Sequence, residues 1–246
     1  VSEGESAVLQ ASPDQQVRYV GVPSMQSPVK SMLEKIPVIT DCRINALQRE
    51  KTNWSLHSAA GDAYADFDAI LLTMPPAQAE QLLAQSGLAG LFVAPHDILE
   101  PCWAVAVQAS GAVPGDAIFC EHPKLRFVSH QRNKAGCQSC YVLHFNARFS
   151  RDHLEQPAEF WFGEASEILR SELGVEGGIE PVVAHRWLYA SQNAQLAATG
   201  LIELPEQCIW IGGDWSFGGR VENAYLSGLN LARAVMRHSP EAAVAL

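Results

Sequence analysis

The sequence predicts an α/β fold, mixed α+β overall, in which two parts of the chain interleave. The apolar run 69–72 has no polar alternation, so we expect a strand buried on both faces, as in a parallel sheet. The segment 158–173 carries apolar residues at helical spacing. A short apolar strand at 208–211 is followed by a loop with glycines and a second amphipathic helix at 222–238.

The remaining elements follow from local signals along the chain. Helical spacing marks 28–34, and Pro75-Pro76 opens a further helix that Gly87 ends. The strands predicted before this helix are 17–21, 38–44, 54–57 and 69–72. Those predicted after it are 103–108, 141–145, 182–189 and 208–211.

Composition and charge narrow the class of protein. Of the 246 residues, 48% are hydrophobic, which is enough for a large core. The balance of 27 acidic and 17 basic residues gives a net charge of −10, which argues against nucleic acid or an anionic membrane as a partner. No apolar run approaches the roughly 18 residues of a membrane span. Because no secretory leader is recognisable either, we expect a cytoplasmic protein.

The six cysteines do not indicate a metal site. Cys137 and Cys140 form a CxxC motif, and Cys120 and His122 lie upstream, so a zinc site is conceivable. The spacing is a poor match, however, because Cys140 enters an apolar run that is typical of a strand. A redox CxxC is expected to open a helix, and nothing helical follows. We therefore predict no metal site and interpret these thiols as incidental.

The segment 209–224 is the most informative part of the sequence. Residues 209–215 are IWIGGDW and residues 218–224 are GGRVENA, so a buried strand leads through a glycine turn to a helix starting near Val221. Glycines let a ligand approach the backbone closely, and a helix N-terminus offers N–H groups and partial positive charge. The same string is also compatible with a plain strand-to-helix crossover that has Asp214 in its turn.

This string resembles the C-terminal FAD-binding motif of the amine-oxidase superfamily of flavoproteins. The resemblance implies that Asp214, after Gly213, contacts the ribityl chain of the flavin. It implies further that Arg220 and Val221 supply backbone donors to the pyrimidine edge, with Ala224 on the first helical turn beneath. A reduced flavin is anionic at N1, so a helix N-terminus at that edge would stabilise it.

The segment 38–44, followed by a hairpin and 69–75, resembles the middle FAD segment of the same family. The resemblance implies that the backbone of 42–44 meets the adenine and that 73–75 passes the pyrophosphate. The cofactor-binding residues predicted by resemblance are Cys42, Arg43, Ile44, Thr73, Met74, Pro75, Gly213, Asp214, Arg220, Val221 and Ala224.

The string AHRWLYA at 184–190, with the strand 141–144 upstream, is similar to the bacterial renalase-like branch of NAD(P)/FAD-dependent oxidoreductases. The candidate substrate residues are His144, His185, Arg186, Trp187, Tyr189 and Trp215. Arg186 could pair with a substrate phosphate or carboxylate, and Trp187 or Trp215 could wall the flavin. In an alternating strand Arg186 faces away from its neighbours, and the aromatic residues and His144 are in positions that more often belong to a core. No catalytic acid or base is predicted.

A family member is expected to carry a strand, a Gly-x-Gly-x-x-Gly turn and a helix, with an acidic residue about 20 positions later. No such fingerprint occurs in the 246 residues, and the opening residues resemble a point inside the substrate domain of a full-length member. We therefore expect a chain truncated at its N-terminus. A shortened relative that no longer holds FAD is the alternative.

The resemblance implies two interleaved domains. The FAD/NAD(P)-binding, Rossmann-like domain comprises 29–95 and 205–240 and lacks its first βαβ unit, and the mixed-sheet substrate domain comprises 1–28 and 96–204. The implied function is FAD-dependent oxidation, in which a small-molecule substrate, an amine or a dihydronicotinamide-type donor, passes a hydride to the flavin. O2 is the implied acceptor, and a nicotinamide nucleotide is a candidate partner. The alternative is a non-catalytic remnant that acts, if at all, as a binding module.

Overall fold

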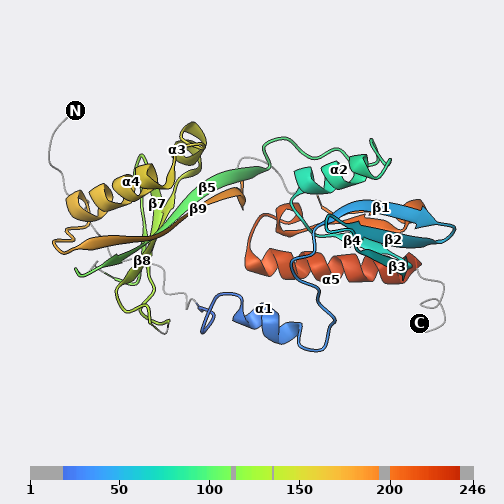
Figure 1. The fold of residues 1–246 in the computed structure, drawn as a ribbon, viewed down its shortest axis with the longest axis horizontal. Coiled ribbons are helices and arrows are strands. Elements are labelled where there is room, and N and C mark those ends of the chain that lie inside the picture. The colour runs from blue at the N-terminus through green and yellow to red at the C-terminus, as the bar shows by residue number, and fades with distance from the viewer. Residues whose placement is uncertain (1–18, 112–114, 135, 194–199, 239–246) are drawn as a thin grey trace. The chain divides into compact units, whose positions relative to one another are not determined.

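The computed structural model describes residues 19–111, 115–134, 136–193 and 200–238 (Figure 1). The chain divides into two compact units. The first unit lies within 1–38 and 101–188, and the second lies within 39–100 and 189–246. Among the described helices, none is both long enough and apolar enough to cross a membrane.

The first unit is built on a five-stranded sheet with the strand order β6-β7-β8-β5-β9. Its strands are β5 (Leu99–Ala109), β6 (Ala117–Phe119), β7 (Leu125–His130), β8 (Cys140–Phe145) and β9 (Ile179–Gln192). β8 pairs antiparallel with β5 on one side and with β7 on the other. The helices are α1 (Ser27–Met32), α3 (Ala147–Asp152) and α4 (Ala158–Ser171).

Helix α4 covers one face of this sheet (Figure 1). The alternation of β5 and β8 directs Val105, Val107 and Leu143 to that face, and each is 0% exposed. Trp161 of α4 is equally buried, and its ring stacks on Trp103 with centroids 4.8 Å apart. The apolar stripe of the helix and the inward side chains of the strands therefore form the core of the first unit.

The second unit contains two three-stranded sheets. One is antiparallel and consists of β1 (Ile44–Glu50), β2 (Asn53–Ser58) and β3 (Ala63–Phe67). The other has the order β10-β11-β4 and consists of β4 (Ile70–Leu72), β10 (Ile202–Leu204) and β11 (Ile209–Ile211). The helices are α2 (Pro76–Gln85) and α5 (Val221–His238), with short 3-10 turns η1 (Pro205–Gln207) and η2 (Asp214–Ser216).

Both faces of β11 are buried. Ile209 and Ile211, each 0% exposed, belong to a hydrophobic cluster that also contains Trp54 of β2. On the opposite face Trp210, 2% exposed, packs against Leu231 of α5. The uninterrupted apolar sequence of this strand is thus explained by cover on two sides.

The predicted fold class is confirmed, because the structure is mixed α/β with several sheets. The helices predicted at 158–173 and 222–238 are present as α4 and α5. Their apolar residues recur over several turns, so the periodic signal is strong.

Three local predictions are wrong. The strand expected at 38–44 begins only at Ile44, because the apolar residues before it have no strand to pair with among the described residues. Of the strand expected at 17–21, residues 17 and 18 lie outside the described residues, and 19–21 are not in a strand. Leu71 is 42% exposed, so β4 is not buried on both faces. The strands β3, β6, β7 and β10 were not predicted.

Candidate functional site

Two parallel strands of the second unit end side by side. The N–H of Ile70 donates to the carbonyl of Cys208 at 2.9 Å, and the N–H of Gly212 donates to the carbonyl of Leu72 at 3.1 Å. The chain therefore leaves β4 at Thr73 and β11 at Gly212 along the same edge of the sheet. In open α/β sheets, ligands bind at the carboxyl ends of such strands.

The turn after β11 is held by a serine. The hydroxyl of Ser216 donates to the carbonyl of Gly213 at 2.6 Å and accepts from the N–H of Gly213 at 3.3 Å. It also lies 3.3 Å from the hydroxyl of Ser227 in α5, and both serines are buried. The turn is thus fixed to the helix that follows it.

Trp215 connects this turn to the end of β4. Its side chain is 1% exposed, and its Nε1 donates to the carbonyl of Met74 at 3.2 Å. A Cβ atom on Gly213 would lie 2.6 Å from that Nε1, so only glycine fits beside the ring. Met74, one of the three predicted residues at 73–75, is therefore linked to the turn after β11 through the ring of Trp215.

Asp214 begins the 3-10 turn η2 and organises the loop to α5. Its carbonyl accepts from the N–H of Gly219 at 2.9 Å, and its carboxylate Oδ1 accepts from the N–H of Trp215 at 2.9 Å. Gly219 has a φ of +58°, and a Cβ there would lie 2.8 Å from the Cβ of Gln192. The second glycine pair is therefore required by backbone conformation and by a close approach.

The N-terminus of α5 is accessible. Val221 is 82% exposed, and Arg220 and Ala224 are exposed as well. The first N–H groups of a helix have no partner within the helix and carry partial positive charge. This end of α5 can therefore donate hydrogen bonds to a group that carries or develops negative charge.

The third predicted cofactor segment lies at the start of β1. The carbonyl of Arg43 accepts from the N–H of Ala59 at 2.8 Å, while the Arg43 side chain is exposed. Ile44 packs on the same hydrophobic cluster as Met74. The Cys42 thiol donates to the Tyr64 hydroxyl at 3.7 Å, and this hydrogen bond raises the pKa of Tyr64.

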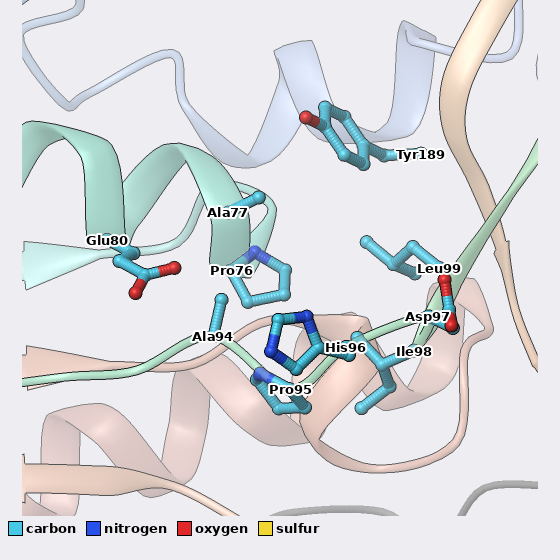
Figure 2. A pocket seen from close by; sticks show the side chains of 10 residues that line it. All are labelled: Pro76, Ala77, Glu80, Ala94, Pro95, His96, Asp97, Ile98, Leu99 and Tyr189. Atoms are coloured by element: carbon cyan, nitrogen blue, oxygen red, sulfur yellow. The ribbon is translucent and has the colours of Figure 1, made fainter.

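A pocket of about 240 Å³ lies beside α2 in the second unit (Figure 2). Its lining includes Tyr189, the predicted substrate residue of the second unit that reaches this cavity. Figure 2 shows Glu80, His96 and Tyr189 on three sides of the pocket. Asp97 also lines it and has a φ of +56°, a conformation that few residues other than glycine adopt. Glu80, His96 and Asp97 are not among the residues predicted from the sequence, because the helix and the loop that supply them carry no motif.

Four predicted substrate residues lie in the first unit. On β9 the rings of His185 and Trp187 are 4.3 Å apart and share a face, as expected for alternation. Arg186 is ion-paired with Glu155 at 2.6 Å. His144 on β8 is partly buried, and burial lowers its pKa. Trp215, the sixth candidate, lies in the core of the second unit.

The second unit thus brings together the cofactor residues around 73–75 and 213–221, whereas the substrate candidates are divided between the units. Within the described ranges, no group of three or more His, Cys, Asp or Glu side chains could hold a metal ion. What the second unit offers chemically is a fixed turn with a carboxylate and an exposed helix N-terminus.

No family model matches the sequence. The structure is similar to a protoporphyrinogen oxidase-like protein from Exiguobacterium sp. 255-15, with a TM-score of 0.60 and 11% identity over 87% of this chain and 51% of that chain. A triple mutant of putrescine oxidase redesigned in cofactor binding gives a TM-score of 0.60 and 12% identity over 87% and 53%. The CLA-producing fatty acid isomerase from P. acnes gives 0.57 and 13% over 85% and 51%.

These likenesses define the fold of the chain. At 11–13% identity they extend no further than the arrangement of helices and strands. The chain spans about half the length of the solved structures that it matches.

Proposed function

We propose that this chain is part of an FAD-dependent oxidoreductase and that its second unit binds the flavin end of the cofactor. The observation that carries the proposal is the junction of β4 and β11 with the turn 213–219 and the exposed start of α5. A crevice at parallel strand ends beside a helix N-terminus is a common place for a nucleotide cofactor. Similarity in fold to two oxidases supports the same interpretation.

The residues at this junction fit a flavin. One oxygen of the Asp214 carboxylate accepts from the N–H of Trp215, which orients the group. An ionised carboxylate can accept about four hydrogen bonds, so capacity remains for the hydroxyls of a ribityl chain. Arg220 and Val221 lie where α5 begins, so their N–H groups would face the pyrimidine edge. Gly213 and Gly219 keep side-chain atoms out of the turn.

FAD, when bound, supplies two-electron redox chemistry. The role of this chain is to hold and orient it: 73–75 would pass the pyrophosphate, the backbone of 42–44 would meet the adenine, and the start of α5 would stabilise negative charge on the ring. Within the proposal the donor is a small reduced molecule and O2 is the acceptor.

An amine is the donor that the pocket beside α2 favours. Glu80 and Asp97 contribute two carboxylates to its lining, and the ring of Tyr189 offers a face to a cation. A dihydronicotinamide-type donor is the other candidate of the proposal. His185, Trp187 and His144 of the first unit belong to the proposal as substrate contacts.

We also propose that FAD binding requires one further strand and helix beside β4. Ile70 and Leu72 make the hydrogen bonds to β11, so the N–H and carbonyl of Leu71 point to the other edge, where none of the described strands pairs. Leu71 faces the α5 side of the sheet and is 42% exposed. The outward apolar residues of α5 are exposed as well: Tyr225, Leu226 and Leu229. An added strand and helix would cover both surfaces.

The test compares two proteins: the 246-residue chain and the product of the longest reading frame that contains it. Each is purified, its visible flavin absorption is recorded, and reconstitution with FAD is attempted. We expect the longer product to retain FAD and the shorter one to retain less. If the longer product is colourless and cannot be reconstituted, the flavoenzyme proposal fails, and a non-catalytic binding module becomes the better account. Equal retention by both would refute the need for a further strand.

A further inference from the structure

Two cysteines of the first unit share one tight turn, whereas the predicted cofactor residues all belong to the second unit. Cys137 and Cys140 lie between β7 and β8, and the N–H of Cys140 donates to the carbonyl of Cys137 at 3.1 Å. A β-turn with this hydrogen bond brings its first and last Cα atoms to less than about 7 Å. Disulfides span about 4.4–6.8 Å between Cα atoms, so the turn keeps the two residues within disulfide range.

The two cysteine side chains interact with each other. The thiols of Cys137 and Cys140 are hydrogen bonded to each other, and both residues are partly exposed. Burial raises the pKa of the Cys140 thiol, and so do the hydrogen bond with Cys137 and the charge on it. Because its pKa is raised, we assign Cys140 to the second, resolving step of thiol–disulfide exchange and Cys137 to the attack on an incoming oxidant.

The surrounding strands hold this turn in place. His130 of β7 is hydrogen bonded through Nε2 to the carbonyl of Gln138 at 2.7 Å. On the other side, the N–H of Ala109 in β5 donates to the carbonyl of Ser139 at 2.9 Å. The residues between the cysteines are thus tied to two strands, and the thiols stay close without a covalent bond.

We propose that Cys137 and Cys140 form a reversible dithiol–disulfide couple that exchanges with low-molecular-weight disulfides such as oxidised glutathione. The Cys137 thiolate attacks one sulfur of oxidised glutathione, which forms a mixed disulfide and releases one glutathione thiolate. Cys140 then loses its proton and attacks the Sγ of Cys137, which releases the second glutathione. Two protein thiols are oxidised to one disulfide, and one oxidised glutathione is reduced to two thiols.

The place of the motif in the fold distinguishes it from a catalytic redox pair. Cys140 is the first residue of β8, so no helix begins after Cys137. A helix N-terminus would stabilise the thiolate and make the disulfide easier to reduce. Without that stabilisation, the couple acts as a modification site that closes the turn between β7 and β8.

The test uses the whole chain with excess oxidised glutathione, followed by alkylation of the remaining thiols, trypsin and mass spectrometry. The tryptic peptide 135–148 contains Cys137 and Cys140 and no other cysteine. We expect this peptide to lose two hydrogen atoms and to escape alkylation, so two of the six cysteines disappear from the thiol count. Reduced glutathione in excess should restore both thiols.

Two variants separate the steps. Cys140→Ser removes the resolving thiol, so glutathione should remain attached to Cys137. Cys120→Ser, at a cysteine whose thiol donates to the Ile118 carbonyl, is the matched control and should leave the peptide result unchanged. The proposal is overturned if the wild-type peptide stays fully alkylated, or if it keeps glutathione and never forms the internal disulfide.

Discussion

Replacing Gly213 by alanine should destabilise the second unit through one specific collision. Gly213 has a φ of 165°, which is extended backbone that alanine adopts equally well, so the backbone contributes no strain. The added Cβ would lie 2.6 Å from Nε1 and 2.7 Å from Cδ1 of Trp215. That ring is 1% exposed and packed near Phe92, so it cannot move away freely.

The magnitude follows from the contacts that the ring must give up. Over-packing a buried site costs about 1–3 kcal/mol. If the ring shifts, its hydrogen bond to the Met74 carbonyl is lost as well, which adds about 1 kcal/mol. We therefore expect Gly213→Ala to lower the free energy of unfolding by about 2–4 kcal/mol.

Urea denaturation followed by far-ultraviolet circular dichroism measures this change. Gly228→Ala is the matched control, because Gly228 is in α5 of the same unit and a Cβ there meets nothing within 4 Å. Alanine at that helical position should stabilise the protein by about 0.5–1 kcal/mol. A Gly213→Ala variant as stable as the wild type would refute the contact between the turn and Trp215.

Three further predictions concern the first unit. Ser150→Ala removes the hydroxyl that accepts from the buried backbone N–H of Trp103 at 3.0 Å, and it should lower the free energy of unfolding by about 1–3 kcal/mol. The control Ser171→Ala, at an exposed serine, should change the free energy of unfolding by less than about 0.5 kcal/mol. Equal stabilities of the two variants would contradict this prediction. Burial, together with the positive charge of Arg126, lowers the pKa of His144 below its usual value of 6.5. Between 6.5 and this lower pKa the unfolded chain binds more protons than the folded chain, so the stability of the protein should fall as the pH drops through that range. His144→Gln should remove this part of the pH dependence in denaturation curves, and an NMR titration midpoint at or above 6.5 would disprove it. Burial raises the pKa of Cys102 to about 11, so iodoacetamide should modify Cys102 more slowly than Cys137. Mass spectrometry of the alkylated peptides measures the two rates, and faster modification of Cys102 would contradict the prediction.

The parts of the fold that the sequence predicted are those with a periodic or continuous apolar signal. The helices α4 and α5 repeat their apolar stripe over several turns, and β11 is apolar throughout because both of its faces are covered. The segment 38–43 shows the opposite case. Val38 and Ile39 are β-branched but 55% and 61% exposed, so local preference gave a strand signal where no partner strand is present in the described part of the chain.

The candidate site divides in the same way. The turn 213–219 could be recognised because close contacts require glycine at Gly213 and Gly219, and the resulting glycine pattern is visible in the sequence. The pocket residues Glu80, His96 and Asp97 could not, because they come from a helix and a loop that carry no motif. Trp215 was a candidate for a ligand contact as well as for the core, and only packing shows that its ring is buried. The cysteine turn was interpreted as incidental because the motif lacks a helix, and its geometry became visible only in the structure.

The affinity for FAD of an Asp214→Ala variant tests the central claim most directly. The measurement is the dissociation constant from quenching of flavin fluorescence, on the product of the longest reading frame that contains this chain. Asp152→Ala is the matched control, since Asp152 is in α3 of the other unit and forms a weak surface pair at 3.9 Å. A hydrogen bond to a charged group contributes about 1.5–3 kcal/mol, so the account predicts affinity weakened by about tenfold or more for Asp214→Ala and unchanged for the control. Equal affinity in both variants would contradict it.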